Sequence, residues 1–337
     1  MNAGLAGATR GRPKPGDVAD RYAIRAAALA PSVLNTQPWY FTVREGTLLL
    51  YADPGRRLDA EDPAGREMVI SCGAALVNLG LAMRHLGFAP DLRPLPDVGQ
   101  PLLLAEVRWG RHAPPSGYED LLHASVARRH TRRGPFVTEV PPLVAEELVR
   151  VARQERADLL LVRDAGACRA LADLVRDAEF AQRASPRVAA ERARWARTAD
   201  SGRSDGVAPA DQSASWDGPE FACRDFGRDP SQETEGSWYP DEPRAVGLVA
   251  LLTTRDDRRP GWLVAGQALQ RLLLHATARG VGVAFHTQPL EIPQLREAVR
   301  AEFTDRAYPQ LLLRLGCGTT AAATPRRPVS DVFRASR

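Results

Sequence analysis

Four arginines occupy the six positions from Arg128 to Arg133, which read Arg-Arg-His-Thr-Arg-Arg and precede Gly-Pro-Phe. Positive charges at this density repel one another unless an anion lies among them. In an extended strand, Arg129, Thr131 and Arg133 would share one face, because side chains alternate between the two faces. Two guanidinium groups and a hydroxyl on one face suit a phosphate group. The alternative on these residues alone is a solvated basic turn.

A second candidate is the polar loop between Pro31 and Trp39. Ser32, Asn35 and Gln37 supply short hydrogen-bonding groups directly after a predicted helix end. The alternation that begins at Trp39 predicts a strand, which would anchor this loop. Such groups could bind a flat polar heterocycle or a polyol chain. A loop that only connects the helix to the strand is the alternative, and these residues leave both interpretations open.

Two further motifs are weak. The segment 316–321 reads Gly-Cys-Gly-Thr-Thr-Ala and imitates the glycine pattern of dinucleotide-binding loops. That function requires a helix next, within a βαβ unit, and Pro325 and Pro328 interrupt the chain there. The segment 10–14, Arg-Gly-Arg-Pro-Lys, resembles the core of an AT-hook, but one copy in a Gly/Pro-rich tail is better explained as solvated chain.

No conventional catalytic group stands out. The histidines are scattered, and Cys72 and Cys317 lie in apolar segments that predict core positions. C-x-x-C pairs and H-E-x-x-H are absent from the sequence, which argues against a zinc site or a disulfide framework. An enzyme without a convincing acid, base, nucleophile or metal ligand set suggests that a cofactor carries the chemistry.

Composition limits the classes of protein. The chain has 337 residues, 45 Lys and Arg against 41 Asp and Glu, and a net charge of +4, which is too small to imply nucleic acid. A hydrophobic fraction of 44% with 26% charged residues is typical of a globular protein. No uninterrupted apolar run approaches 18 residues, so we expect no membrane span. Residues 1–17 predict a disordered tail without a signal core, and the cytoplasm is the expected location.

Hydrophobic spacing predicts an alternation of helices and strands. In the first part of the chain we expect a helix over 18–29, a hairpin of strands 39–44 and 47–51, a helix over 66–86 that ends at Gly87, and a strand over 102–109. In the second part we expect helices over 143–154, 166–198 and 262–279 and after Pro293, with strands over 158–163, 246–253 and 311–315. Residues 199–243 lose this pattern but contain aromatic residues, which favours a functional lid.

An internal repeat connects the two parts. The pattern Gly73-x-Ala-Leu-x-x-Leu-x-Leu reappears from Gly266, 193 positions later, and Gly87 matches Gly280 at the same offset. Each of these helices precedes a predicted strand. The repeat predicts two related lobes in one chain, which would imitate a two-fold dimer with a ligand site at the interface.

These segments together resemble the flavin-dependent nitroreductase family, in its single-chain, duplicated Acg-type branch. Ala30–Trp39 resembles the family's A-P-S-x-x-N-x-Q-P-W signature, and Arg129–Phe136 resembles its arginine phosphate motif. Further matches cover 56–79, 288–291, 308–312 and 324–329. The resemblance implies an α+β fold with two lobes, each an antiparallel sheet flanked by helices, arranged as a pseudo-dimer. The lobes would span 18–117 and 118–337, with a lid insertion at about 199–243.

The resemblance also implies a composite FMN site. Arg129 and Thr131 would bind the phosphate, and Arg133 would reach the ribityl chain or the N1/O2 edge of the ring. Ser32 and Asn35 would contact the ribityl chain and ring from the first lobe, in the same loop as Gln37. Gln288, Pro289, Leu290 and Glu291 match the segment whose backbone N–H lies beside flavin N5, and Arg326 or Arg327 would close on the phosphate.

The implied activity is hydride transfer from NADH or NADPH, through flavin N5, to a nitroaromatic, quinone or similar small-molecule acceptor. No side chain need act as acid or base, so none is named as catalytic. The alternative is a catalytically weak protein that sequesters FMN under the lid. The resemblance implies a monomer with internal pseudo-two-fold symmetry, with further dimerisation open. The charge and the lack of a long apolar run argue against a nucleic-acid or membrane partner.

Overall fold

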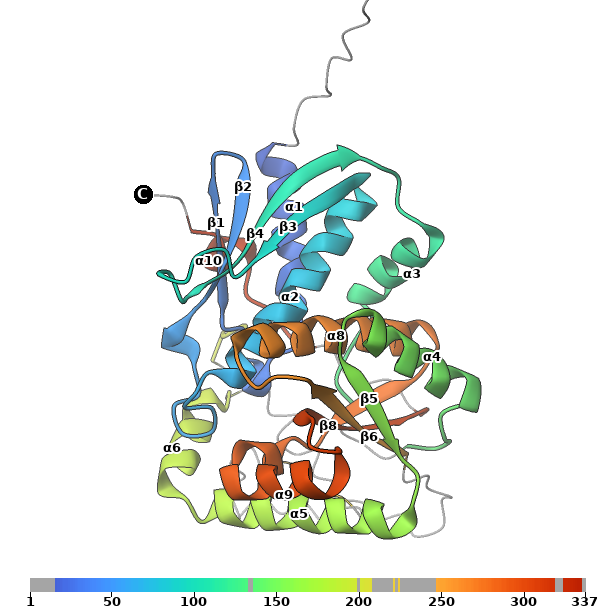
Figure 1. Cartoon of the computed structure of the whole chain (residues 1–337). Coiled ribbons are helices and arrows are strands. Elements are labelled where there is room, and N and C mark those ends of the chain that lie inside the picture. The colour runs from blue at the N-terminus through green and yellow to red at the C-terminus, as the bar shows by residue number, and fades with distance from the viewer. Residues whose placement is uncertain are drawn as a thin grey trace, which may run out of the picture.

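The computed structural model describes residues 16–132, 136–198, 201–207, 221, 224, 247–318 and 324–334. Over these residues the chain forms two lobes, each built on a four-stranded antiparallel sheet with helices packed against it (Figure 1). The predicted α+β fold class is confirmed. Of the tail expected over 1–17, only Gly16 and Asp17 are described, and most of the segment 199–243 lies outside the described residues.

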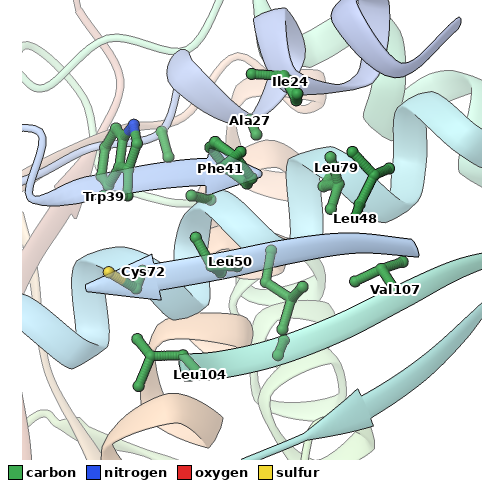
Figure 2. Packing of buried hydrophobic residues seen from close by; sticks show 14 of the residues in the cluster. Ile24, Ala27, Trp39, Phe41, Leu48, Leu50, Cys72, Leu79, Leu104 and Val107 are labelled. Carbon is green, nitrogen blue, oxygen red and sulfur yellow. The ribbon is translucent and has the colours of Figure 1, made fainter. Parts of the chain in front are cut away.

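The first lobe contains the predicted elements in the predicted order, with one further strand over 88–94 that was not predicted. It contains α1 (Asp17–Ala28), β1 (Trp39–Arg44), β2 (Thr47–Ala52), α2 (Arg66–His85), β3 (Phe88–Pro94) and β4 (Leu103–His112), and its sheet has the order β1-β2-β4-β3. The β1–β2 hairpin turns at Glu45 and Gly46, which both have positive φ, as a tight hairpin turn requires. The apolar side chains of β1, β2 and β4 pack against α1 and α2 and form the core of this lobe (Figure 2).

The second lobe repeats this plan. It contains α4 (Pro142–Gln154), β5 (Asp158–Val162), β6 (Leu248–Thr254), α8 (Arg259–Ala278), β7 (Gly282–Phe285), α9 (Pro293–Phe303) and β8 (Tyr308–Gly316). The sheet order β5-β6-β8-β7 matches that of the first lobe position by position. Because both described sheets are antiparallel, β8 does not enter a βαβ unit, which a dinucleotide-binding loop at 316–321 would require. Residues 319–321 of that pattern lie outside the described residues.

A long insertion distinguishes the second lobe from the first. Two residues join β1 to β2, whereas α5 (Ala165–Arg183), α6 (Pro186–Trp195) and the segment that follows lie between β5 and β6. Residues 166–198 are mostly helical, as predicted, but they form two helices, because α5 ends before Ser185 and Pro186. The Ser185 hydroxyl accepts from the backbone N–H of Val188 and caps a separate helix, α6.

The repeated glycines lie where the lobes meet. A Cβ atom at Gly73 of α2 would lie 2.4 Å from the carbonyl oxygen of Leu263, and one at Gly266 of α8 would lie 2.0 Å from that of Ile70. Neither position tolerates a side chain without a shift of the backbone. The glycine repeat therefore lets α2 and α8 pack closely enough to join the lobes. Helix α3 (Gly117–Val126) packs against both of these helices.

The last described segment returns to the first lobe. Phe333 forms a parallel bridge with Phe41 of β1, and α10 (Val329–Val332) packs against α1, as Figure 1 shows beside β1. Residues 324–334 therefore pack on the lobe that precedes them by about 200 positions. Helix α2 is long and apolar enough to cross a membrane by length and composition, but it is mostly buried and acts as a core helix.

Candidate functional site

A cavity of about 1050 Å³, which includes the solvent at its mouth, lies between the lobes. The first lobe contributes the loop Pro31–Leu34 and the first turns of α2. The second part of the chain contributes the end of β7 and the residues after it, with side chains from α8 and β8. Both lobes are therefore needed to form the cavity.

The loop that carries the predicted polar residues is held in an unusual conformation. Leu34, Asn35 and Gln37 all have positive φ, and the Ser32 hydroxyl accepts from the backbone N–H of Gln37 at 2.9 Å. Left-handed backbone at non-glycine residues costs free energy and persists where the surroundings impose it. Ser32 lines the cavity, as the site prediction expects of a ligand-facing residue.

Asn35 and Gln37 hold distant segments to this loop. The Asn35 amide donates to the carbonyls of Gly206 and Pro325, both at 3.1 Å. The Gln37 side chain is fully buried, donates to the Ser204 carbonyl at 2.9 Å and accepts from the backbone of Arg327. Gln37 thus acts as a structural clamp. Asn35 differs, because its buried Oδ1 atom has no hydrogen-bond partner among the described residues.

Arg129 and Arg326 form what we call the arginine corner. Arg129 is 3% exposed, and neither its Nε nor its Nη1 atom has a hydrogen-bond partner in the described part of the chain. Burial, with a smaller contribution from the Arg326 charge, lowers the pKa of Arg129 to about 9, so the group stays cationic at neutral pH. Arg326 donates to the Ala30 carbonyl, next to the cavity-lining Pro31. The corner is a buried site of positive charge.

The rest of the arginine motif runs along the second lobe. Thr131 forms a parallel bridge with Val283 of β7, and the Arg132 N–H donates to the Val283 carbonyl at 2.9 Å. Thr131 and Arg132 both line the cavity that Ser32 and its loop also line. Of the extended strand predicted for 129–133, the described residues form only this short bridge. Arg133 lies outside them, so its proposed role stays a prediction.

The two arginines of the C-terminal segment have different surroundings. The Arg327 guanidinium donates to the carbonyls of Gln37 and Asp331, and its backbone N–H donates to the Gln37 side chain. Arg327 therefore fastens the C-terminal segment to the first lobe. Arg326, by contrast, has a charge that acts on Arg129 and on His130. Burial lowers the pKa of His130, and the charges of Arg129 and Arg326 lower it further.

The segment expected beside the flavin ring forms the short helix η4 (Gln288–Glu291). Its side chains face a buried group of charges, while the preceding residues 284–287 line the cavity. The Leu290 carbonyl accepts from Arg66, and Glu291 accepts from Gln182 and pairs with Arg224. Gln288 is fully buried with its Oε1 atom unpartnered among the described residues. Pro289 is buried in the same turn.

The buried group of charges, which we call the carboxylate cluster, was missed by the sequence analysis. Arg192 of α6 pairs with Glu61 at 2.7 Å and with Glu179 of α5 at 3.1 Å. Arg224 pairs with Glu61 at 2.8 Å and also with Glu291, so it connects the two lobes. These partners lie 13 to 163 positions apart. In the sequence, only the high density of charged residues at 61–67 could have indicated this cluster.

Comparison with known proteins identifies the class of this protein. No family model matches the chain. Rv3131 of Mycobacterium tuberculosis H37Rv, which bears the name NAD(P)H nitroreductase, is 32% identical over 325 residues that cover 93% of this chain and 90% of the relative. The acg protein of the same strain, named likewise, is 28% identical and covers 92% and 94%. The chain belongs to the NAD(P)H nitroreductase family and is an oxidoreductase.

Solved structures agree on the fold. A nitroreductase from Anabaena variabilis superposes with a TM-score of 0.52 at 11% identity, over 91% of this chain and 90% of that one. The FMN-dependent nitroreductase NfnB from Mycobacterium smegmatis, solved with NADPH, has a TM-score of 0.40 at 17% identity over 65% and 99%. The likeness to the Anabaena variabilis structure confirms the two-lobed nitroreductase fold.

Proposed function

We propose that the chain binds one FMN between its lobes and passes hydride from NADH or NADPH to a nitroaromatic, quinone or similar flat acceptor. The observation that carries the proposal is the arginine corner. A buried guanidinium with two unpartnered nitrogen atoms, beside a second arginine, is costly unless an anion pairs with it. The phosphate of FMN has the charge and the acceptor oxygens that such a corner needs.

The donor set fits FMN beyond its phosphate. Thr131 offers a hydroxyl near the arginine corner, and we assign the phosphate to Arg129, Thr131 and Arg326 rather than to Arg327, which the first lobe already holds. Ser32 faces the cavity from the first lobe, and the buried Oδ1 atom of Asn35 offers an acceptor. In this proposal the two lobes act as a pseudo-dimer, with the boundary near residue 117.

FMN, when bound, supplies the two-electron chemistry that connects a nicotinamide donor to the acceptor. The chain contributes binding, orientation and charge. Arg133 would stabilise negative charge at the N1/O2 edge of the ring, and the backbone of Gln288–Glu291 would donate at N5. The Arg66 bond to the Leu290 carbonyl holds that turn in place. The apolar residues Ile70, Leu269 and Leu311 in the cavity wall reduce the access of water to the ring.

The test begins with the purified protein. We expect a yellow preparation with flavin absorbance, from which denaturation releases FMN at about one per chain. Steady-state oxidation of NADH and NADPH with menadione or a nitroaromatic then measures turnover. A colourless protein that takes up neither FMN nor riboflavin on titration would refute the proposal.

The inserted segment supports a second candidate, an FMN-sequestering protein with little turnover. Arg224, which belongs to this segment, lines the cavity and is anchored to Glu61 and Glu291, so part of the insertion reaches the site. A protein that binds FMN stoichiometrically but oxidises no nicotinamide with any acceptor would favour this candidate. Recovery of turnover in an Arg224→Ala variant would show that the segment restricts access.

A further inference from the structure

Glu67, the second residue of α2, lines the cavity between the lobes. The residue is 5% exposed. Its Oε1 atom accepts from the Arg66 guanidinium at 3.0 Å, but its Oε2 atom has no hydrogen-bond partner among the described residues. A buried carboxylate oxygen without a donor is costly, because burial removes the water that would otherwise solvate it. The proposed function gives Glu67 no role.

The surroundings of Glu67 contain more acids than bases. With Glu67 and its neighbours included, the carboxylate cluster has five acidic groups and four guanidinium groups. The acids are Glu61, Asp62, Glu67, Glu179 and Glu291, and the bases are Arg66, Arg183, Arg192 and Arg224. Arg183 is half-exposed and contributes least. Arg296 also acts on Glu67, but Asp257 pairs with it at 2.6 Å. Arg132, Arg314 and His286 line other parts of the same cavity.

Glu67 is the member with the poorest compensation for a negative charge. Glu61 is paired with two arginines, and Glu291 has Arg224 and the Gln182 amide. Asp62 accepts the backbone N–H of Met68 at the start of α2, where the helix end favours an anion. Arg66, the partner of Glu67, also donates to the carbonyls of Gln310 and Leu290. The proton that balances the cluster therefore belongs on Glu67.

We propose that Glu67 is a neutral carboxylic acid that directs its proton into the cavity and, in turnover, transfers this proton to the acceptor. This inference rests on the proposed function. A quinone that receives a hydride, with its two electrons, needs one proton to become a neutral hydroquinone. Glu67 gives that proton, becomes a carboxylate and regains a proton from water. A nitro group has the same need at its oxygen atoms.

The electrostatics agree with this assignment. Burial is the largest reason that the pKa of Glu67 lies well above its usual range, and the nearby Glu291 raises it further against the opposing charge of Arg66. The position of Glu67 in the first turn of α2 favours the anion, but this effect is smaller than the cost of burying an unpaired charge.

The protonation state is measured directly by infrared spectroscopy of the FMN-loaded protein at neutral pH. We expect a protonated-carboxyl band in wild type that disappears in Glu67→Gln, persists in the exposed control Glu146→Gln, and shifts when menadione is added to the oxidised protein. A wild-type spectrum without a band that depends on Glu67 would overturn the inference. If the protein takes up no FMN, the proposed function fails, and the same band in the unloaded protein still tests whether Glu67 is protonated.

Kinetics separate proton transfer from a structural role. Loss of a general acid lowers the rate by about 100-fold or more, so we expect Glu67→Gln to lower kcat with menadione by about 100-fold. In wild type kcat should fall as pH rises through the pKa of Glu67, and the variant should show no such fall. Because a neutral amide replaces a neutral acid of the same shape, FMN affinity should change less than about threefold. A variant that keeps the wild-type pH profile would contradict the assignment.

Discussion

The arginine corner and the carboxylate cluster are both buried beside one cavity, but they differ in how their charges are balanced. In the corner, two nitrogen atoms of Arg129 have no partner among the described residues, and the charge of another arginine, Arg326, acts on it. In the cluster, each of Arg192 and Arg224 pairs with two carboxylates. The cluster needs only a proton to complete it, whereas the corner needs an anion from outside the chain. Paired charges indicate a structural role here, and unpaired charge indicates a binding site.

The largest expected effect comes from breaking the cluster. Arg192→Met removes the buried cation that Glu61 and Glu179 share. Among the described residues, Glu61 then keeps Arg224, and Glu179 keeps the half-exposed Arg183. Removing one partner of a buried ion pair typically costs about 3–5 kcal/mol, and we expect a fall of this size in the free energy of unfolding. Urea denaturation measures it. Arg187→Met, an exposed change in the same helix, should alter stability by less than about 0.5 kcal/mol.

The corner should respond in the opposite way. Arg129→Met removes a buried charge without a partner, so the protein without FMN should become more stable by about 1–3 kcal/mol. FMN binding should weaken by about 100-fold, as expected for the loss of about 3 kcal/mol of charged hydrogen bonds. Thermal denaturation with and without FMN measures both effects. The exposed neighbour Arg128→Met should change neither, and a destabilised Arg129→Met protein would show that the corner is structural.

The close packing of α2 against α8 at Gly73 joins the two lobes and can be tested by substitution. Gly73→Ala places a methyl group 2.4 Å from the Leu263 carbonyl and should destabilise the protein by about 1–3 kcal/mol. Gly80→Ala lies in the same helix, where a Cβ atom would contact only Pro90, at 3.8 Å. That change should stabilise the protein by about 0.4–1 kcal/mol. Equal effects in denaturant titrations would mean that the glycine repeat does not join the lobes.

The smallest expected effect is a pH dependence of the cluster. Burial raises the pKa of Asp62 from 3.8 to about 6, against the opposing hydrogen bond from Met68. A carboxyl group with a raised folded-state pKa destabilises the folded protein as pH rises from about 4 to about 6, because the unfolded chain loses its proton first. Asp62→Asn should remove this fall in the free energy of unfolding between about pH 4 and pH 6. Asp59→Asn, an exposed change nearby, should leave the fall intact.

Local patterns in the sequence predicted most of the fold. The β1–β2 hairpin was readable from alternation and from Glu45-Gly46, and α2 from its apolar spacing and Gly87, which adopts φ +85° after the helix. Strands β3 and β7 were missed. The first contains two prolines and is half-exposed or exposed throughout, and the second has only four residues. Such strands form because a neighbouring strand pairs with them, which spacing along the chain does not reveal.

Local motifs pointed to segments that the structure brings together, although the binding roles of their residues stay predictions. The loop that contains Ser32 and the segment that contains Thr131 do line one cavity. The structural duty of Gln37 was not predictable, because its partners are Ser204 and Arg327, 167 and 290 positions away. Glu67 lies within the segment 56–79, which resembles the family as a whole and did not single out this residue. Its surroundings are formed by residues from three separate segments, around 62–66, 224 and 291.

Titration of wild-type protein with FMN and with riboflavin, followed by flavin fluorescence, tests the central claim most directly. The two ligands differ only in the phosphate that the arginine corner should bind. We predict one FMN per chain, an affinity for FMN at least about 100-fold above that for riboflavin, and loss of this preference in Arg129→Met. Equal affinity of the wild-type protein for both flavins, or no binding of either, would contradict the account.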